Sequence, residues 1–111
     1  MQLNDKQRIE VKDVIESAKQ TEYKSFNNII AKAVKELKKG VKTEEQAYNK
    51  IYKKVIKNEH HLAHRYAELD DAKSMRTLAE VFADDIINMY EFENLDQFVK
   101  KEVYRITGIN A

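Results

Sequence analysis

The sequence predicts an all-α fold, a bundle of four to five helices around a long central helix at about residues 44–69. Proline is absent and only two glycines occur among the 111 residues, so few positions can interrupt a helix. Apolar residues recur at intervals of three and four along most of the chain, whereas no stretch shows the alternation typical of strands. A chain of this length can bury one core, so we expect a single helical domain over residues 1–111.

Composition narrows the possible chemistry and the setting of the protein. Cysteine is absent, which excludes disulfide frameworks, thiolate metal sites and cysteine nucleophiles. The N-terminus is charged from its fifth residue onward, and no apolar run approaches the roughly 18 residues that a membrane span requires. We therefore expect a cytoplasmic protein without membrane contact. Sixteen lysines against four arginines are a bias typical of AT-rich coding, which favours an origin in a low-GC bacterium or its phage.

The first third of the chain predicts two helices separated by a break. Asn4 is suited to cap a helix over about residues 5–19, whose narrow apolar face repeats every three or four residues. The pattern then falters, and Thr21 is one of two residues that could cap a second helix. That helix would enter its apolar stripe at Phe26 and end at Gly40, because glycine adopts the left-handed conformation after a helix at little cost.

The central helix has the clearest N-terminal signal. Thr43 and Gln46 have the spacing of a capping box, in which each side chain satisfies a backbone N–H group of the other residue. A helix over residues 44–69 would be about 39 Å long at 1.5 Å per residue, so it has to span the domain, break near Asn58 or reach into a partner. We expect it to span the domain. Its apolar residues share one sector of the helix: Tyr48, Ile51, Tyr52, Val55, Leu62, Tyr66 and Leu69.

A break between Asp70 and Ser74 should separate the central helix from the next one. Apolar residues keep a spacing of three and four over residues 75–90, which predicts a helix of about sixteen residues. Val81 and Ile87 widen its apolar surface beyond one stripe. We therefore expect this helix either to be in contact on two sides or to expose an apolar patch.

The last predicted helix begins after Asn94, which is suited to cap it, and ends at Gly108. The residues expected to be buried on this helix are Leu95, Phe98, Val99, Val103 and Ile106.

The three histidines lie on the central helix and suggest a metal site. His60, His64 and Glu68 are spaced by four residues, so two imidazoles and a carboxylate could converge on one ion such as zinc. However, the helical wheel places them on the polar side of the helix, and the HExxH pattern is absent. We therefore expect His60, His61 and His64 to form a solvated polar face without a metal or other cofactor, and keep metal binding as a third hypothesis.

Four lysines form a stripe along the same helix, at positions i, i+3, i+4 and i+7: Lys50, Lys53, Lys54 and Lys57. Such a stripe can follow a phosphate backbone through contacts that do not depend on sequence. Arginine is scarce, however, and Tyr48 and Tyr52 belong to the apolar sector, so stacking on bases is not indicated. We therefore expect these lysines to bind a protein partner, with nucleic acid as the alternative.

The charge of the chain is unevenly distributed. Residues 1–58 contain fourteen Lys and Arg against eight Asp and Glu, a formal charge of +6, whereas residues 59–111 contain six against eleven, or −5. Such an asymmetry can steer a charged partner or favour head-to-tail self-association.

No arrangement of residues indicates catalysis. Asp84 and Asp85 fall outside the main apolar stripe of their helix, so we expect both in solvent, and no serine lies in a glycine-framed elbow. We therefore expect no catalytic residue. The function predicted is that of a small non-enzymatic protein of the accessory or inhibitor type, which acts by binding another macromolecule through its charged faces or through an exposed part of the helix over residues 75–90.

Overall fold

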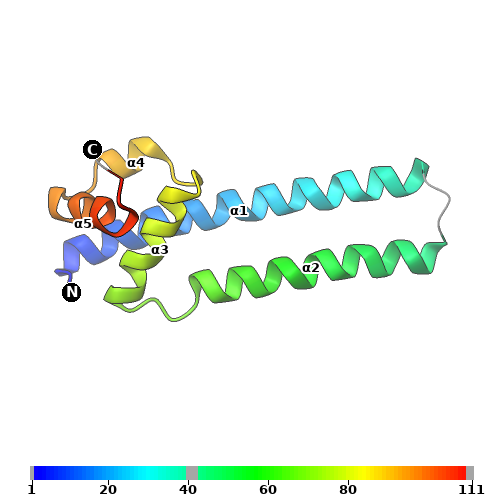
Figure 1. Ribbon diagram of the computed structural model, residues 1–111, viewed down its shortest axis with the longest axis horizontal. Helices are drawn as coiled ribbons and strands as arrows, with labels where there is room; N and C mark the ends of the chain where they lie inside the picture. Colours follow the sequence, from blue (N-terminus) through cyan, green and yellow to red (C-terminus); the bar gives the residue numbers. More distant parts are fainter. Residues whose placement is uncertain (1, 40–42, 110–111) are drawn as a thin grey trace. The chain divides into compact units, whose positions relative to one another are not determined.

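The computed structural model describes residues 2–39 and 43–109, and within these ranges it contains α-helices and no strand. The helices are α1 (Asp5–Lys39), α2 (Glu44–Tyr66), α3 (Asp71–Ala83), α4 (Met89–Glu93) and α5 (Gln97–Thr107), as Figure 1 shows. The all-α prediction is confirmed. The helix end predicted at Gly40 lies outside the described residues.

The chain forms two compact units. Unit 1 combines Met1–Thr21 with Glu68–Ala111, and unit 2, which we call the hairpin, is Glu22–Ala67. Helix α1 supplies its first part to unit 1 and its second part to the hairpin. That the whole chain is a single domain stays a prediction.

Helix α1 is one continuous helix of 35 residues, so the break predicted near Thr21 is wrong. The Thr21 hydroxyl donates to the Ser17 carbonyl at 3.1 Å, inside the helix, and is therefore not used as a cap. The predicted cap at Asn4 is confirmed. Gln7 N–H donates to the Asn4 side chain at 2.8 Å, and Asn4 N–H donates to the Gln7 side chain at 2.9 Å.

Unit 1 has a well-formed apolar core, in which α3 packs against α5. The ring of Phe92 in α4 is fully buried and lies 4.7 Å from the ring of Phe82 and 5.9 Å from that of Tyr104, between ring centroids. These edge and tilted contacts are the geometry that aromatic rings prefer. The aliphatic side chains of this unit with no exposed surface are Val11, Ala18, Leu78, Val81, Val99 and Val103.

Helix α3 ends at Ala83, so the helix predicted over residues 75–90 is too long. Asp85 adopts a left-handed conformation with φ of 59°, which Asp tolerates better than most residues. Its N–H donates to the Phe82 carbonyl at 3.2 Å, and Ile86 N–H donates to the Val81 carbonyl at 3.0 Å. These two hydrogen bonds form a Schellman motif. Such a motif ends a helix, and the apolar residues on either side of the end can still be buried.

The residues that widened the apolar surface of this segment are both buried, Val81 in α3 and Ile87 in the loop that follows. The segment is therefore in contact on two sides.

Helix α5 is capped by Asp96, whose carboxylate accepts from Phe98 N–H at 2.8 Å, whereas Asn94 closes α4. The predicted cap at Asn94 is therefore wrong, because the preceding short helix already uses this residue. Gly108 ends α5 with φ of 72°, as predicted. Leu95, Val99 and Val103 are buried as expected, but Phe98 and Ile106 are 52% and 39% exposed.

An ion pair fastens the start of α1 to the start of α3 in unit 1. Arg8 donates from Nε to Asp71 Oδ1 at 2.9 Å and from Nη2 to Asp71 Oδ2 at 3.0 Å. Leu3 N–H donates to the same carboxylate at 3.0 Å. The hydrogen bonds from Arg8, followed by the one from Leu3, lower the pKa of Asp71 to about 2, while Asp71 raises the pKa of Arg8.

Replacing Asp71 with Asn should make the stability of the protein less dependent on acid pH. The folded-state pKa of about 2 lies below the usual 3.8, so the carboxylate stabilises the fold above about pH 4 and loses this effect as the pH falls toward 2. We expect Asp71→Asn to lower the melting temperature at neutral pH and to reduce the decline between pH 4 and pH 2. Thermal unfolding measured across this range checks it.

The matched control is Asp5→Asn, which removes the almost fully exposed partner of the same arginine and should change little. A decline in acid that is equally steep in Asp71→Asn and in the wild type would contradict the assignment.

Candidate functional site

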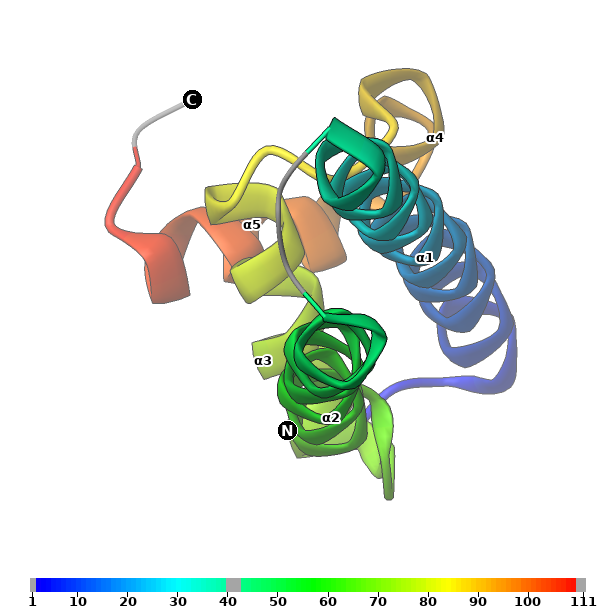
Figure 2. The same cartoon turned by 90° about the vertical axis from the view of Figure 1, so that its right-hand side faces the viewer.

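The hairpin consists of the second part of α1 and α2, which run antiparallel side by side (Figures 1 and 2). Helix α2 is unbroken at Asn58 and ends at Tyr66, three residues before the predicted end at Leu69. Thr43 caps it as predicted, because its hydroxyl accepts from Gln46 N–H at 3.2 Å. The described side chains of the hairpin with less than a tenth of their surface exposed are Ala33, Leu62 and Glu22.

Glu22 is a buried carboxylate that holds the two helices together. It is 5% exposed and accepts hydrogen bonds from three residues of α2. Its Oε2 lies 2.8 Å from His61 Nε2, and its Oε1 accepts from the Tyr66 hydroxyl at 2.8 Å and from the Arg65 guanidinium. Since a buried charge is costly without partners, this set of donors is what allows Glu22 to be buried.

The aromatic rings around Glu22 also include Phe26. Phe26 contacts the His61 ring edge to face, with ring centroids 5.9 Å apart. Burial, followed by the hydrogen bond to Glu22, raises the pKa of Tyr66 above its usual range. The phenol therefore stays protonated at neutral pH and serves as a donor to the carboxylate.

The role of Glu22 has a signal in the sequence that the prediction did not use. Ala18 precedes Glu22 by four residues and Phe26 follows it by four, so all three share one face of α1. The apolar pattern is interrupted there because the residue that faces α2 at this turn is the glutamate itself. His61 is 42% exposed, in line with the expected solvated face, but its Nε2 also lies 2.8 Å from the Glu22 carboxylate.

The two helices divide the hairpin into two sides. In an antiparallel pair of helices, the residue directly after a contact position points to one side of the pair on both helices. The residue directly before a contact position points to the opposite side. Tyr23 follows the buried Glu22, and Tyr52 follows the half-buried Ile51. We call this the tyrosine side; its members are Tyr23, Val34, Tyr48, Tyr52, Val55 and Ile56.

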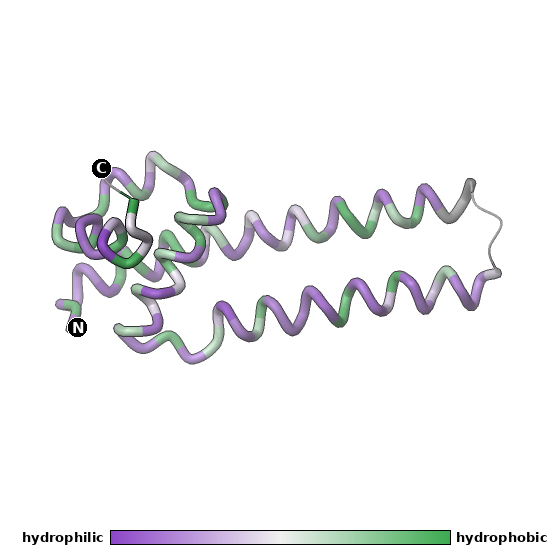
Figure 3. The backbone as a smooth tube through the Cα atoms, viewed as in Figure 1, coloured by the Kyte–Doolittle hydropathy of each residue, from purple (hydrophilic) through white to green (hydrophobic). Residues whose placement is uncertain are grey.

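The tyrosine side is exposed, which contradicts the expected burial of this sector of α2. Tyr48 is 69% exposed and Tyr52 is 53% exposed, and their rings stack with centroids 6.3 Å apart and planes 13° from parallel. Val55 is 44% exposed. The reason is geometric, since a single neighbouring helix covers one narrow face of α2. Figure 3 shows apolar positions spread along both helices of the hairpin.

The opposite side is basic. Lys32 precedes the buried Ala33, and Lys50 and Lys57 precede the half-buried Ile51 and Asn58. We call it the lysine side; its members are Lys32, Lys50, Lys53, Lys54 and Lys57. No ion pair joins any of these lysines to another residue within the described ranges 2–39 and 43–109. The charge asymmetry also follows the units, because residues 22–67 carry eleven Lys and Arg against five Asp and Glu, or +6.

The predicted metal ligands are not gathered by α2. His60 and His64 are exposed on the helix, but the helix ends at Tyr66, and Glu68 follows with a left-handed φ of 55°. The helical spacing that would have aligned Glu68 with the histidines is thereby lost. Among the residues that the structure describes, no three His, Asp or Glu side chains lie together as metal ligands.

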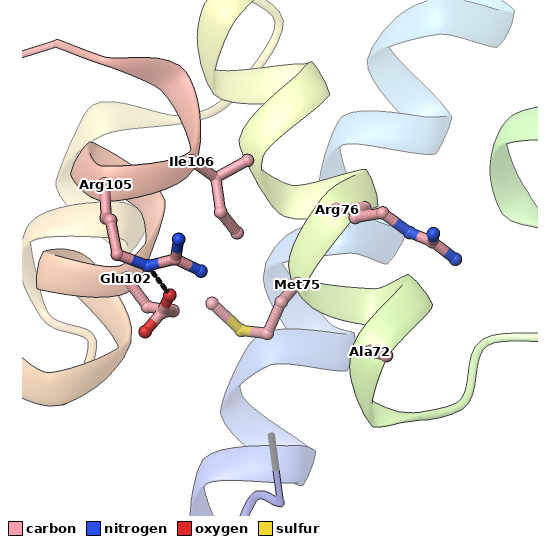
Figure 4. A pocket seen from close by; sticks show the side chains of 6 residues that line it. All are labelled: Ala72, Met75, Arg76, Glu102, Arg105 and Ile106. Carbon is pink, nitrogen blue, oxygen red and sulfur yellow. Dashed lines mark hydrogen bonds and ion pairs between the residues drawn. The ribbon is translucent and has the colours of Figure 1, made fainter.

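A pocket of about 450 Å³ lies between α3 and α5 in unit 1 (Figure 4). Met75 and Ile106 supply apolar surface, while Glu102 accepts from the Arg105 guanidinium at the rim. In Figure 4 the Arg76 guanidinium points away from this ion pair. The pocket therefore combines an apolar floor with a carboxylate that an arginine already neutralises.

Comparison with protein-family models, with curated proteins and with solved structures finds no match for this chain. Of the helices that the structure describes, none combines the length and the apolar character needed to cross a lipid bilayer.

Replacing Glu22 with Ala should destabilise the hairpin by about 3 kcal/mol, because the largely buried charge of Arg65 would lose the Glu22 carboxylate. Urea unfolding followed by helical circular dichroism measures the change. Glu36→Ala is the matched control, since Glu36 is an exposed glutamate of α1 within the hairpin, and should stay within about 0.5 kcal/mol of the wild type. Equal effects of the two substitutions would show that Glu22 does not hold the hairpin together.

Proposed function

We propose that this protein is a small non-enzymatic binding protein, and that the lysine side of the hairpin docks on the acidic surface of a protein partner. The contacts come from Lys50, Lys53, Lys54 and Lys57 of α2, with Lys32 of α1 beside them. The observation that carries the proposal is the concentration of unpaired positive charge on one side of an otherwise exposed hairpin.

Charge placement supports a binding role because the lysines do little for the fold. Lys50, Lys53 and Lys57 are exposed, and the described residues offer them no carboxylate partner. Like charges three and four residues apart on a helix repel each other, which costs a few tenths of a kcal/mol per pair. An acidic surface removes this repulsion and gains from electrostatic steering, which raises the rate of association.

A protein partner is favoured over nucleic acid by the residues that the lysine side lacks. Its cations are all lysines, whereas bidentate recognition of phosphate favours arginine. Arg65, the arginine of the hairpin, is engaged with Glu22. Tyr48 and Tyr52 are exposed, contrary to expectation, but lie on the other side of α2, so a strand tracked by the lysines would not stack on them.

Nucleic-acid binding is the second candidate, because several lysines spaced along two helices match a contact with a phosphate backbone. It makes a distinct prediction about salt. The logarithm of the affinity for duplex DNA would fall with the logarithm of the salt concentration, by roughly 0.9 per phosphate contacted.

Replacing Lys53, Lys54 and Lys57 with Gln should weaken partner capture about tenfold, since each exposed ion pair is worth up to about 1 kcal/mol. The immobilised wild-type chain and the triple variant would be incubated with nuclease-treated extract of the native cell and eluted with a salt gradient. We expect the wild type to retain a protein that elutes at moderate salt and that the variant retains poorly. Circular dichroism of the variant should match that of the wild type.

The matched control replaces Lys6, Lys19 and Lys101 with Gln, which removes the same charge from unit 1. This control should capture the partner as well as the wild type does. Capture that needs intact nucleic acid would favour the second candidate, and capture that is equal in all three chains would rule out the lysine side as the contact.

A further inference from the structure

The hairpin buries too little apolar surface to hold its own conformation. Among its described residues, Ala33 and Leu62 are the buried apolar side chains, each 6% exposed. Burying a leucine gains about 1.5–3 kcal/mol, whereas ordering the backbone costs about 1–2 kcal/mol per residue. Helices in proteins owe most of their stability to packing of an apolar face. Unit 1, which has the fully buried Phe92 ring and a buried aliphatic core, does not share this shortage.

Most of the uncovered apolar surface of the hairpin lies on its tyrosine side, although Ile29, which is 44% exposed and precedes the half-buried Ile30, lies outside it. Tyr48 and Tyr52 alone leave about 240 Å² exposed if a whole tyrosine side chain offers about 200 Å². Tyr23, Val34, Val55 and Ile56 are between 37% and 44% exposed, which brings the side to about 500 Å² in total. Two such surfaces in contact would bury about 1,000 Å², which is the lower bound for a specific interface.

We propose that the tyrosine side is a dimer interface, and that its occupant is the tyrosine side of a second copy of this chain. Two hairpins packed in this way form a four-helix bundle, in which every helix touches two neighbours instead of one. The arrangement is isologous, so each tyrosine side contacts the same residues of the other copy. Tyr52 lies in the middle of the exposed apolar residues of α2, and it therefore lies next to Tyr52 of the second copy.

The distribution of charge fits a second copy as the occupant. Glu59, which directly follows the half-buried Asn58, is the charged residue on the tyrosine side of α2. The lysines lie on the opposite side. Two hairpins with a formal charge of +6 each therefore meet through a largely apolar surface that carries the acidic Glu59, and they keep their lysines apart, largely beyond the Debye length of about 8 Å. The dimer leaves both lysine sides open and is thus compatible with the partner contact proposed above.

This interface should respond to salt in the opposite way to the lysine side. Added salt screens the repulsion between two basic hairpins and does not weaken apolar contacts. Dimerisation should accordingly stay constant or strengthen as salt rises, whereas binding to an acidic partner should weaken.

Sedimentation equilibrium of the whole chain tests the proposal. We expect a reversible equilibrium between the 13.1 kDa chain and a dimer of twice that mass. Tyr52→Glu should raise the dimer dissociation constant by about 30-fold or more, as expected for a charge placed at the centre of an interface. Lys53→Glu, a change on the lysine side, should not raise it. A chain that stays monomeric up to about 100 μM, or a dimer that Lys53→Glu breaks and Tyr52→Glu does not, overturns the proposal.

A second measurement does not depend on the folding of a charged variant. Because the chain contains no cysteine, a single Tyr52→Cys substitution gives one reactive thiol. A short bifunctional maleimide should join Tyr52→Cys chains into dimers and leave Lys53→Cys chains as monomers. Equal crosslinking of both overturns the two-fold arrangement. If Tyr48 and Tyr52 are instead protected by a different protein in extract while the purified chain is monomeric, the second copy is the wrong occupant.

Discussion

Two helices that pack on each other bury one narrow face of each helix against the other, and this limit governs the hairpin Glu22–Ala67. Its buried positions are few, and the deepest polar one is the carboxylate of Glu22. Three donors from α2 converge on this group, so the hydrogen bonds fix which faces of the two helices meet. Directional contacts specify the pairing here, but they gain less free energy than an apolar core would.

The two sides of the hairpin follow from that pairing. Once Glu22 and Ala33 of α1 face α2, the residues one position later must turn to one side and the residues one position earlier to the other. The sequence places tyrosines and aliphatics at the first set and lysines at the second. One surface therefore suits a contact driven by apolar burial, and the other suits a contact driven by charge. The two can be occupied together because they lie back to back on the hairpin.

Much of the helical structure could be predicted from local signals, whereas its interruptions and its burial could not. The caps at Asn4 and Thr43 and the stop at Gly108 depend on a few adjacent residues, and the structure confirms them. The stop after α3 depends on Asp85 in a left-handed conformation, which a periodic apolar pattern does not reveal. The apolar periodicity of α2 predicts that Tyr48 and Tyr52 are buried, but both are exposed. Periodicity shows which residues share a face of a helix and does not show whether another element covers that face.

In the proposed dimer, the hairpin owes its order to the second copy that covers its tyrosine side. Backbone hydrogen exchange of the whole chain, followed by mass spectrometry at high and low protein concentration, tests it most directly. We expect amides of α2 to exchange slowly in concentrated protein and much faster on dilution, while amides of α3 and α5 in the core of unit 1 keep the same protection. Slow exchange of α2 that does not change on dilution would contradict it.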